Sequence, residues 1–378
     1  MAAAATVAAP PPGTGVLDTP PPQMLTAAQT VMAVHPPRKA LATLTAVGDI
    51  VFVGLHHGLV LGYPVMDGSE PVVEITAHEG CVRELRPATH EGKPALLSCS
   101  ADGNAKMWAV PSGEWLATFA PPEGNRASAN CMAMMDGGRL AVGYSDGVVR
   151  LFDLGSHKIV QTMKVHAGQV KALLRPVVRA DADGNPAAPI DLPPHCLLTA
   201  SDDGLGKLVL TQTKEVATVF GCQSAAHACA FVAPNAFFGC SDGRIRAFDV
   251  LTGAPTAVLK DHTDAVNQLL EADGELYSAS DDTTIRQWDV PKWTTAFTFA
   301  GNAYCVSAIA VDGAGRLVSA AFGGAVTVWD RRGVINRFKE IETRAAEERA
   351  AKLKAQKEAE KAKAAAADKA RKAAGKKK

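Results

Sequence analysis

A segment with one fixed layout recurs along this chain, and the recurrence constrains the fold more than any other feature of the sequence. The clearest copy runs from Asp261 to Val290, DHTDAVNQLLEADGELYSASDDTTIRQWDV. In this copy a His turn, an Ala-Asp-Gly turn and an Asp-Asp corner each lead into a short apolar run. Such runs bounded by turn residues predict a β-meander. One meander cannot bury both of its faces, so the copies must pack on one another.

The third strand of each copy has a recognisable end, and these ends show the period. They fall at Val65, Val110, Leu154, Thr211, Val250, Val290 and Arg331. The spacing is close to 40 residues in most copies, and the Trp-Asp ending is fully present in the sixth and seventh. A period near 40 residues is typical of propeller blades with four strands each.

On these repeats and their Trp-Asp endings, the sequence resembles the WD-repeat β-propellers over residues 29–338. The resemblance implies an all-β fold, a seven-bladed β-propeller of four-stranded antiparallel blades. Residues 1–28 are rich in Ala and Pro, which predicts a disordered leader. Residues 339–378 are rich in Lys, Ala and Glu, which predicts a solvated α-helix that ends in a basic tail.

Two segments could supply the outer strand of the last blade. Thr30–Val34 lies in QTVMAVH, which is similar to the outer-strand segment QTMKVH at 161–166. In the family, such an N-terminal strand commonly completes the last blade, and closure of this kind removes the open sheet edges. The rival is Val334–Phe338. We favour the N-terminal segment.

Two blades contain a polar set that could be mistaken for catalytic machinery. By resemblance these residues are structural tetrads, His78, Ser98, Asp102 and Trp108 in blade two and His262, Ser278, Asp282 and Trp288 in blade six. The Asp can orient the imidazole, which contacts the hydroxyl, which accepts from the indole N–H, so that each buried polar group gains a partner. A hydrolase would also use Ser, His and Asp. The set occurs twice and no GxSxG elbow accompanies it, so we predict no enzyme and no catalytic residue.

The remaining blades depart from the tetrad. Blade four keeps His166, Thr199 and Asp203 but has Val209 in place of Trp. Blades three and five have a corner Asp and a Phe but no leading His, and blade seven has Gly323 in place of Asp. We expect the departing blades to open more easily than blades two and six, because they have fewer local hydrogen bonds. The longest insertion, Pro176–Pro194, separates the first and second strands of blade four and reads as a loop.

Cysteine usage and hydropathy exclude several classes of protein. The eight cysteines lack the spacing of a disulfide framework, which favours free thiols in a reducing compartment. Cys222, His227 and Cys229 form the tightest cluster, but no second ligand pair follows, so we expect no metal and no cofactor. No long apolar run predicts a membrane span, and the N-terminus is a poor secretory signal. We expect a monomer in the cytoplasm, with the nucleus as the alternative.

Charge is distributed unevenly although its formal sum is zero. Residues 336–378 contain 15 Lys and Arg and 7 Asp and Glu, a net charge of +8, so the rest of the chain has a net charge of −8. Beyond Ile341 the only large aliphatic residue of the tail is Leu353, which argues against a true coiled coil. Its basic end, which could contact nucleic acid or an acidic surface, comprises Lys369, Arg371, Lys372, Lys376, Lys377 and Lys378.

By resemblance to the family, the propeller should hold partner proteins or peptides on its faces. The residues before the corner Asp and in the His turns would line one such face, and the expected contacts are His56, Glu79, Asp202, Asp264, Asp281 and Phe322. This set is mildly acidic, which favours basic peptides. We therefore predict a non-enzymatic interaction scaffold within a multiprotein complex. The alternative is a subunit of an RNA- or ribosome-associated complex that uses the basic tail.

Overall fold

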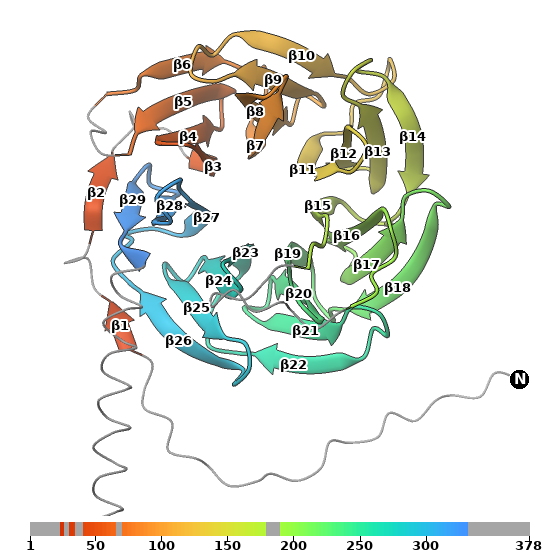
Figure 1. Cartoon of the computed structure of the whole chain (residues 1–378). Helices are drawn as coiled ribbons and strands as arrows, with labels where there is room; N and C mark the ends of the chain where they lie inside the picture. The colour runs from red at the N-terminus through yellow and green to blue at the C-terminus, as the bar shows by residue number, and fades with distance from the viewer. Residues whose placement is uncertain (1–22, 26–29, 35–40, 66–69, 179–189, 332–378) are drawn as a thin grey trace, which may run out of the picture.

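The computed structural model is a closed ring of β-sheets around a central channel (Figure 1). It describes residues 41–65, 70–178 and 190–331, together with the backbone of 23–25 and 30–34. All the elements in this part of the chain are strands. The basic tail, most of the N-terminal leader and the middle of the insertion lie outside the described residues.

Seven sheets form the blades, and in each of them consecutive strands are antiparallel neighbours, as the sequence predicted. Blade one contains β3 (Leu41–Val47), β4 (Ile50–Leu55), β5 (Leu59–Pro64) and β6 (Val73–Thr76). Blade two contains β7 (Val82–His90), β8 (Lys93–Ser100), β9 (Ala105–Ala109) and β10 (Trp115–Phe119). Blade three contains β11 (Ala129–Met135), β12 (Arg139–Tyr144), β13 (Val148–Asp153) and β14 (Ile159–Lys164). Blade four contains β15 (Val170–Leu174), β16 (Cys196–Ser201), β17 (Leu205–Leu210) and β18 (Glu215–Gly221).

The last three blades repeat this order. Blade five contains β19 (Ala226–Val232), β20 (Asn235–Cys240), β21 (Ile245–Asp249) and β22 (Pro255–Leu259). Blade six contains β23 (Val266–Ala272), β24 (Glu275–Ser280), β25 (Ile285–Asp289) and β26 (Thr294–Phe299). Blade seven contains β27 (Val306–Val311), β28 (Leu317–Ala321) and β29 (Val326–Trp329), and its fourth strand comes from the other end of the chain.

That fourth strand is β2 (Thr30–Val34), which closes the ring. It pairs antiparallel with β29, in a register that places Val34 opposite Val326. The prediction of N-terminal closure is confirmed, and the edge that the rival segment would have filled is occupied. Because β2, from the N-terminal part of the chain, completes the last blade, opening blade seven requires separation of the two ends of the propeller.

Blade six has a fifth strand that the repeat pattern did not predict. β1 (Gln23–Leu25) lies along β26 and pairs with it in parallel, with Gln23 opposite Phe297. These residues fall within 1–28, where we expected a leader without regular structure, so the boundary of that leader was placed too late. Their composition gave no strand signal, because three residues are too few to show a period.

The core is divided among the interfaces between neighbouring blades. Seven buried apolar clusters correspond to the seven interfaces of the ring in the described residues. In the cluster between blades seven and one, for example, Leu41 and Val53 pack with Val318 and Val328, all of them buried. Burial of this kind is worth about 25 cal/mol per Å² of apolar surface. Each blade is therefore stabilised by its neighbours.

Candidate functional site

Blade six contains a continuous chain of hydrogen bonds that begins at its corner Asp. His262 Nδ1 lies 2.7 Å from Asp282 Oδ2, and its Nε2 lies 2.6 Å from Ser278 Oγ. The indole N–H of Trp288 donates to the same Ser278 oxygen at 2.8 Å. With the carboxylate as acceptor, Nδ1 carries the imidazole proton and Nε2 accepts from the hydroxyl.

Blade two repeats this arrangement almost unchanged. His78 Nδ1 lies 2.9 Å from Asp102, its Nε2 lies 2.8 Å from Ser98 Oγ, and Trp108 donates to Ser98 at 2.9 Å. In both blades the Asp also accepts from two backbone N–H groups, one in the His turn and one just beyond the corner. Each tetrad therefore joins the His turn, the corner and the third strand of one blade.

The surroundings of the two serines argue against nucleophilic chemistry. Ser98 and Ser278 are fully buried, and His78 and His262 are each only 5% exposed. A nucleophile has to reach its substrate, whereas each of these hydroxyls is enclosed between an imidazole and an indole. The arrangement instead supplies partners for polar groups that are costly to bury alone.

We expect Asp282→Ala to lower the free energy of unfolding by about 1–3 kcal/mol, because it leaves the buried His262 without its acceptor. The midpoint of urea unfolding measures this loss. Asp264→Ala is a suitable control, since Asp264 is exposed and its carboxylate accepts from the N–H of the adjacent residue Ala265, whereas its backbone carbonyl, which accepts from Ser280, is kept in the variant. An unchanged midpoint in Asp282→Ala would show that the tetrad contributes nothing to stability.

Stability should also fall at acidic pH through the tetrad carboxylates. Burial alone would raise the pKa of Asp102, Asp203 and Asp282, but hydrogen bonds from the imidazoles and the backbone outweigh it and hold each pKa below its usual value. In the unfolded chain an Asp takes up a proton near pH 3.9. The stabilisation is therefore complete above about pH 4 and is lost as the pH falls toward the lower pKa of the folded state.

The midpoint of urea unfolding, measured at several values between about pH 5 and about pH 2.5, tests this dependence, because proton linkage predicts the loss of stability in this range. Each carboxylate contributes up to about 1.4 kcal/mol per pH unit. Asp282→Asn should give a shallower slope than the wild type, and an identical slope would contradict the assignment.

Blade four preserves three members of the set. His166 lies 2.9 Å from Asp203 and 2.8 Å from Thr199 Oγ1. Val209 stands at the Trp position, and the Thr199 hydroxyl instead lies 3.2 Å from the carbonyl oxygen of Lys207. Its single proton is shared between this carbonyl and the imidazole Nε2, because no indole N–H reaches its oxygen in this blade. In blade seven, Trp329 donates to Ser319 at 3.0 Å, as in the complete tetrads.

Blades three and five hold their corner Asp with an arginine, a solution that the sequence analysis missed. Arg246 donates two hydrogen bonds to Asp242, at 3.0 and 2.6 Å, and Arg150 lies 3.4 Å from Asp146. Both guanidinium groups are buried beside the third strand. The available signal was the combination of a missing leading His with an Arg four residues after the corner Asp, since Arg286 has the same spacing from Asp282 in blade six, where the His is present.

Blade five also replaces the polar side chains of the tetrad with aromatic ones. Phe238 and Phe248 occupy the Ser and Trp positions, with ring centroids 6.0 Å apart. Phe220, from the outer strand of blade four, lies 5.2 Å from Phe238 and 5.6 Å from Phe248. A packed aromatic cluster can replace a polar network without loss of stability. The expectation that such blades open more easily stays a prediction.

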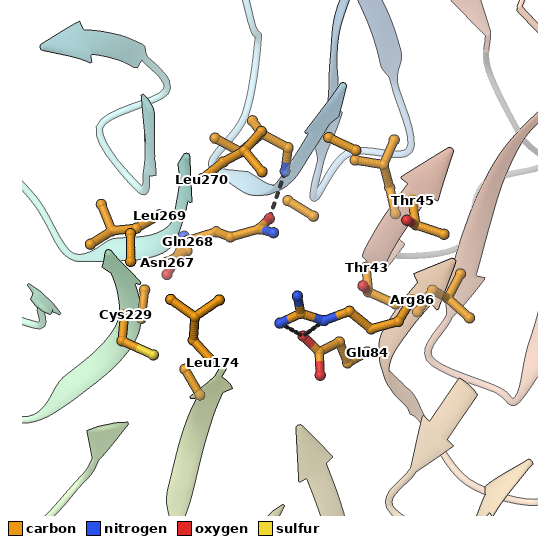
Figure 2. A pocket seen from close by; sticks show the side chains of 18 of the residues that line it. Thr43, Thr45, Glu84, Arg86, Leu174, Cys229, Asn267, Gln268, Leu269 and Leu270 are labelled. Carbon is orange, nitrogen blue, oxygen red and sulfur yellow. Dashed lines mark hydrogen bonds and ion pairs between the residues drawn. The ribbon is translucent and has the colours of Figure 1, made fainter. Parts of the chain in front are cut away.

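The first strands of the seven blades surround the channel, which contains a cavity of about 530 Å³ (Figure 2). Each of these strands has a bulge at its second residue, and all seven bulged residues line the cavity. They are Ala42, Arg83, Asn130, Lys171, His227, Asn267 and Ser307. A bulge bends a strand and redirects its side chains.

Side chains in the channel form hydrogen bonds to the backbone of neighbouring blades. Glu84 accepts from the N–H of Met132, and Gln268 accepts from the N–H of Ile309 at 2.7 Å. Figure 2 shows the ion pair between Arg86 and Glu84, in which an N–O distance is 2.7 Å. These bonds satisfy backbone groups on strand edges that the splayed blades leave without a neighbouring strand. The polar groups of the channel thus hold the ring together.

The cysteines of the described residues are free thiols, and all except the half-buried Cys81 and Cys305 are buried. Burial raises the pKa of Cys229 to about 12, so its sulfur stays a protonated thiol, which is a poor metal ligand and nucleophile. In this part of the chain no group of three or more His, Cys, Asp or Glu side chains is placed to hold a metal ion. Nor does any helix there have the length and apolar character needed to cross a membrane.

The structure brings together two of the expected contact residues from neighbouring blades. The rings of His56 and Phe322 meet edge to face, with centroids 5.8 Å apart, and His56 Nδ1 lies 3.5 Å from Cys81 Sγ. Phe322 is 52% exposed, and Tyr304, in the turn beside it, is 56% exposed. Tyr304 was not among the predicted residues. Its alignment with Asp264 in the His turn of blade six was the signal that could have identified it.

The acidic members of the predicted set differ in their surroundings. Asp202 lies 3.9 Å from Lys171 and 3.8 Å from His227, so its charge is partly neutralised. Asp281 accepts from the amide of Asn267 at 2.7 Å. Its neighbour Asp264 is exposed.

Glu79 lies in the His turn of blade two and donates its backbone N–H to Asp102. Of the four acidic residues in the predicted contact set, Asp264 and Asp281 lie in blade six, next to the blade that presents Tyr304 and Phe322. The basic tail residues lie outside the described part of the chain.

Comparison with sequence families finds matches in several blades. Residues 69–109 and 253–289 match the family described as "WD domain, G-beta repeat". Residues 103–175 match "Anaphase-promoting complex subunit 4 WD40 domain". The first two matches contain the two complete tetrads, and the third begins at the corner of blade two and extends through blade three.

Known proteins with similar sequences contain the same repeat. The angio-associated migratory cell protein of Homo sapiens is 30% identical over 220 residues, which cover 53% of this chain and 47% of that protein. An uncharacterized WD repeat-containing protein of Schizosaccharomyces pombe is 32% identical over 127 residues, or 30% of this chain and 20% of that protein. The matched region spans about half the length of the human relative. It spans about a fifth of the length of the Schizosaccharomyces pombe relative.

Among solved structures, the fold is similar to that of the computationally designed Ika8 protein. The TM-score is 0.59 with 20% sequence identity, over 80% of this chain and 99% of the designed one. At this identity the likeness concerns the fold alone.

Proposed function

Because this chain belongs to the WD-repeat family, whose propellers generally hold other proteins, we propose that it is a non-enzymatic interaction scaffold within a multiprotein complex. The observation that carries the proposal is the contrast between its buried and its exposed side chains. The Ser, His and Asp of the tetrads are committed to internal hydrogen bonds, whereas Tyr304 and Phe322 leave more than half of their surface in solvent. Neighbouring exposed aromatic residues favour protein contact over chemistry.

The match of residues 103–175 to a domain of an anaphase-promoting complex subunit supports a role inside an assembly. The second candidate, a subunit that binds RNA through its tail, is favoured by the net charge of +8 in residues 336–378.

Purification of the tagged chain from its native cells, with and without nuclease, separates the two proposals. A scaffold retains its protein partners after nuclease treatment. A second form, with the six basic residues of the tail end replaced by Gln, should retain them as well. If every partner is lost with nuclease and with the Gln-substituted tail, the tail carries the function and the scaffold proposal is wrong.

A further inference from the structure

Blades seven and one differ from the other five at their corners. The corner residues are His57 in blade one and Gly323 in blade seven, whereas the other blades have Asp. The two blades are neighbours in the closed ring (Figure 1). The loss of Asp from both corners therefore affects one continuous region of the surface.

An aromatic surface has formed in this region. A Cβ on Gly323 would lie 2.0 Å from the ring of Tyr304, so the ring lies directly against the backbone of the glycine. The N–H of Phe322 donates to the carbonyl of Cys305, which fixes the two exposed rings on adjacent turns. His56 extends this surface onto blade one through its ring contact with Phe322.

A pair of carboxylates adjoins the other side of the Tyr304 turn. Burial first, and then the nearby carboxylates of Asp281 and Asp264, raise the pKa of Cys305. The N–H of Asp281 donates to the carbonyl of Ala265, next to Asp264, so both acids lie on the blade-six side of that turn. Among the described residues neither forms an ion pair with a Lys or Arg. A cation could therefore bind to them without displacing another.

We propose that His56, Phe322, Tyr304, Asp264 and Asp281 form one aromatic–acidic strip that binds a linear peptide of a partner protein. The peptide places an apolar side chain on Tyr304 and Phe322 and a neighbouring Lys or Arg on Asp264 and Asp281. This deepens the proposed scaffold function and rests on it. Aromatic residues supply contact area at low entropic cost, and the uncompensated carboxylates select the charge of the peptide.

The test is selection from a display library of random linear peptides on the folded full-length chain. We expect the enriched peptides to contain Phe, Tyr, Trp or Leu within a few residues of Lys or Arg. Two arms then measure their affinity, with Tyr304→Ser/Phe322→Ser in one and Asp264→Asn/Asp281→Asn in the other. Each should weaken binding by about tenfold or more, and the second should also reduce its dependence on salt.

The matched control is Trp115→Ser, because Trp115 is 59% exposed on β10, the outer strand of blade two. It should leave affinity unchanged. Circular dichroism and thermal melting show whether each variant is folded. If the double Ser variant does not fold, the double Asn variant decides the outcome. Failure to enrich any such peptide, or equal affinity for the wild type and the folded strip variants, overturns the proposal. Protein partners that survive nuclease but bind the strip variants normally would overturn the strip and leave the scaffold function standing.

Discussion

Replacing Arg331 by Ala is expected to lower the free energy of unfolding by about 3–5 kcal/mol, because it removes a large buried side chain and leaves the backbone carbonyls that it binds without a donor. Arg331 follows β29 and is 1% exposed. Its Nε donates to the carbonyl of Gly315 at 3.1 Å, and its other nitrogens reach into blade six. There it forms an ion pair with Asp273, and its guanidinium lies 5.5 Å from the centre of the Tyr277 ring.

The physical cost has two parts. Truncation empties a space as large as an arginine side chain, and it leaves buried acceptors of blades six and seven without a donor. Arg331→Lys keeps the charge but not the planar fork, so it should recover only part of the loss. Arg244→Ala is the control, because that side chain is 50% exposed and its corner Asp is already held by Arg246. It should change stability by no more than about 0.5 kcal/mol.

Urea unfolding monitored by tryptophan fluorescence and by circular dichroism measures both variants. If Arg331→Ala unfolds at the same urea concentration as Arg244→Ala, the contact between blades six and seven is not a stabilising one. Coincidence of the two probes also shows whether the ring unfolds as one unit.

The repeat pattern was sufficient to predict the ring, since the order of the strands in each blade follows directly from the meander. It also predicted the tetrads of blades two and six, because equal offsets from a corner Asp place side chains at equal positions in equal blades. The role of Arg331 could not be predicted in this way. Its partners Gly315 and Asp273 lie in turns of two different blades, and no spacing within one copy relates them.

The pattern was least informative where copies had lost the tetrad. We interpreted the missing His of a copy as the loss of hydrogen bonds at its corner. In blade five, however, Arg246 donates two hydrogen bonds to the corner Asp242. Tyr304 was likewise missed, because its ring lies against Gly323, which is in another turn of the same blade. In both cases two positions of one copy differ from the repeat together. Comparing each position separately with the repeat does not show that the two residues are in contact.

Replacing Phe238 by Ala should destabilise the chain by about 3–5 kcal/mol, which exceeds the loss expected for Asp282→Ala. Phe238 is fully buried between blades four and five, and its ring packs with Phe220 and Phe248. It also crosses onto blade four, where a Cβ added to Gly206 would lie 2.3 Å from the ring. The matched control is Phe322→Ala, since Phe322 is 52% exposed and should tolerate the same change with a loss of no more than about 0.5 kcal/mol.

Gly206 allows the contact itself to be tested by a double-mutant cycle. Gly206→Ala alone should cost about 1–3 kcal/mol, because its methyl group overlaps the Phe238 ring. In the presence of Phe238→Ala that methyl group enters space the ring has left, so the double variant should lose less stability than the sum of the single losses. Additive losses within about 0.5 kcal/mol would show that the two residues do not pack against each other. A blade without a polar tetrad would then need another source of cohesion than its aromatic contact with blade four.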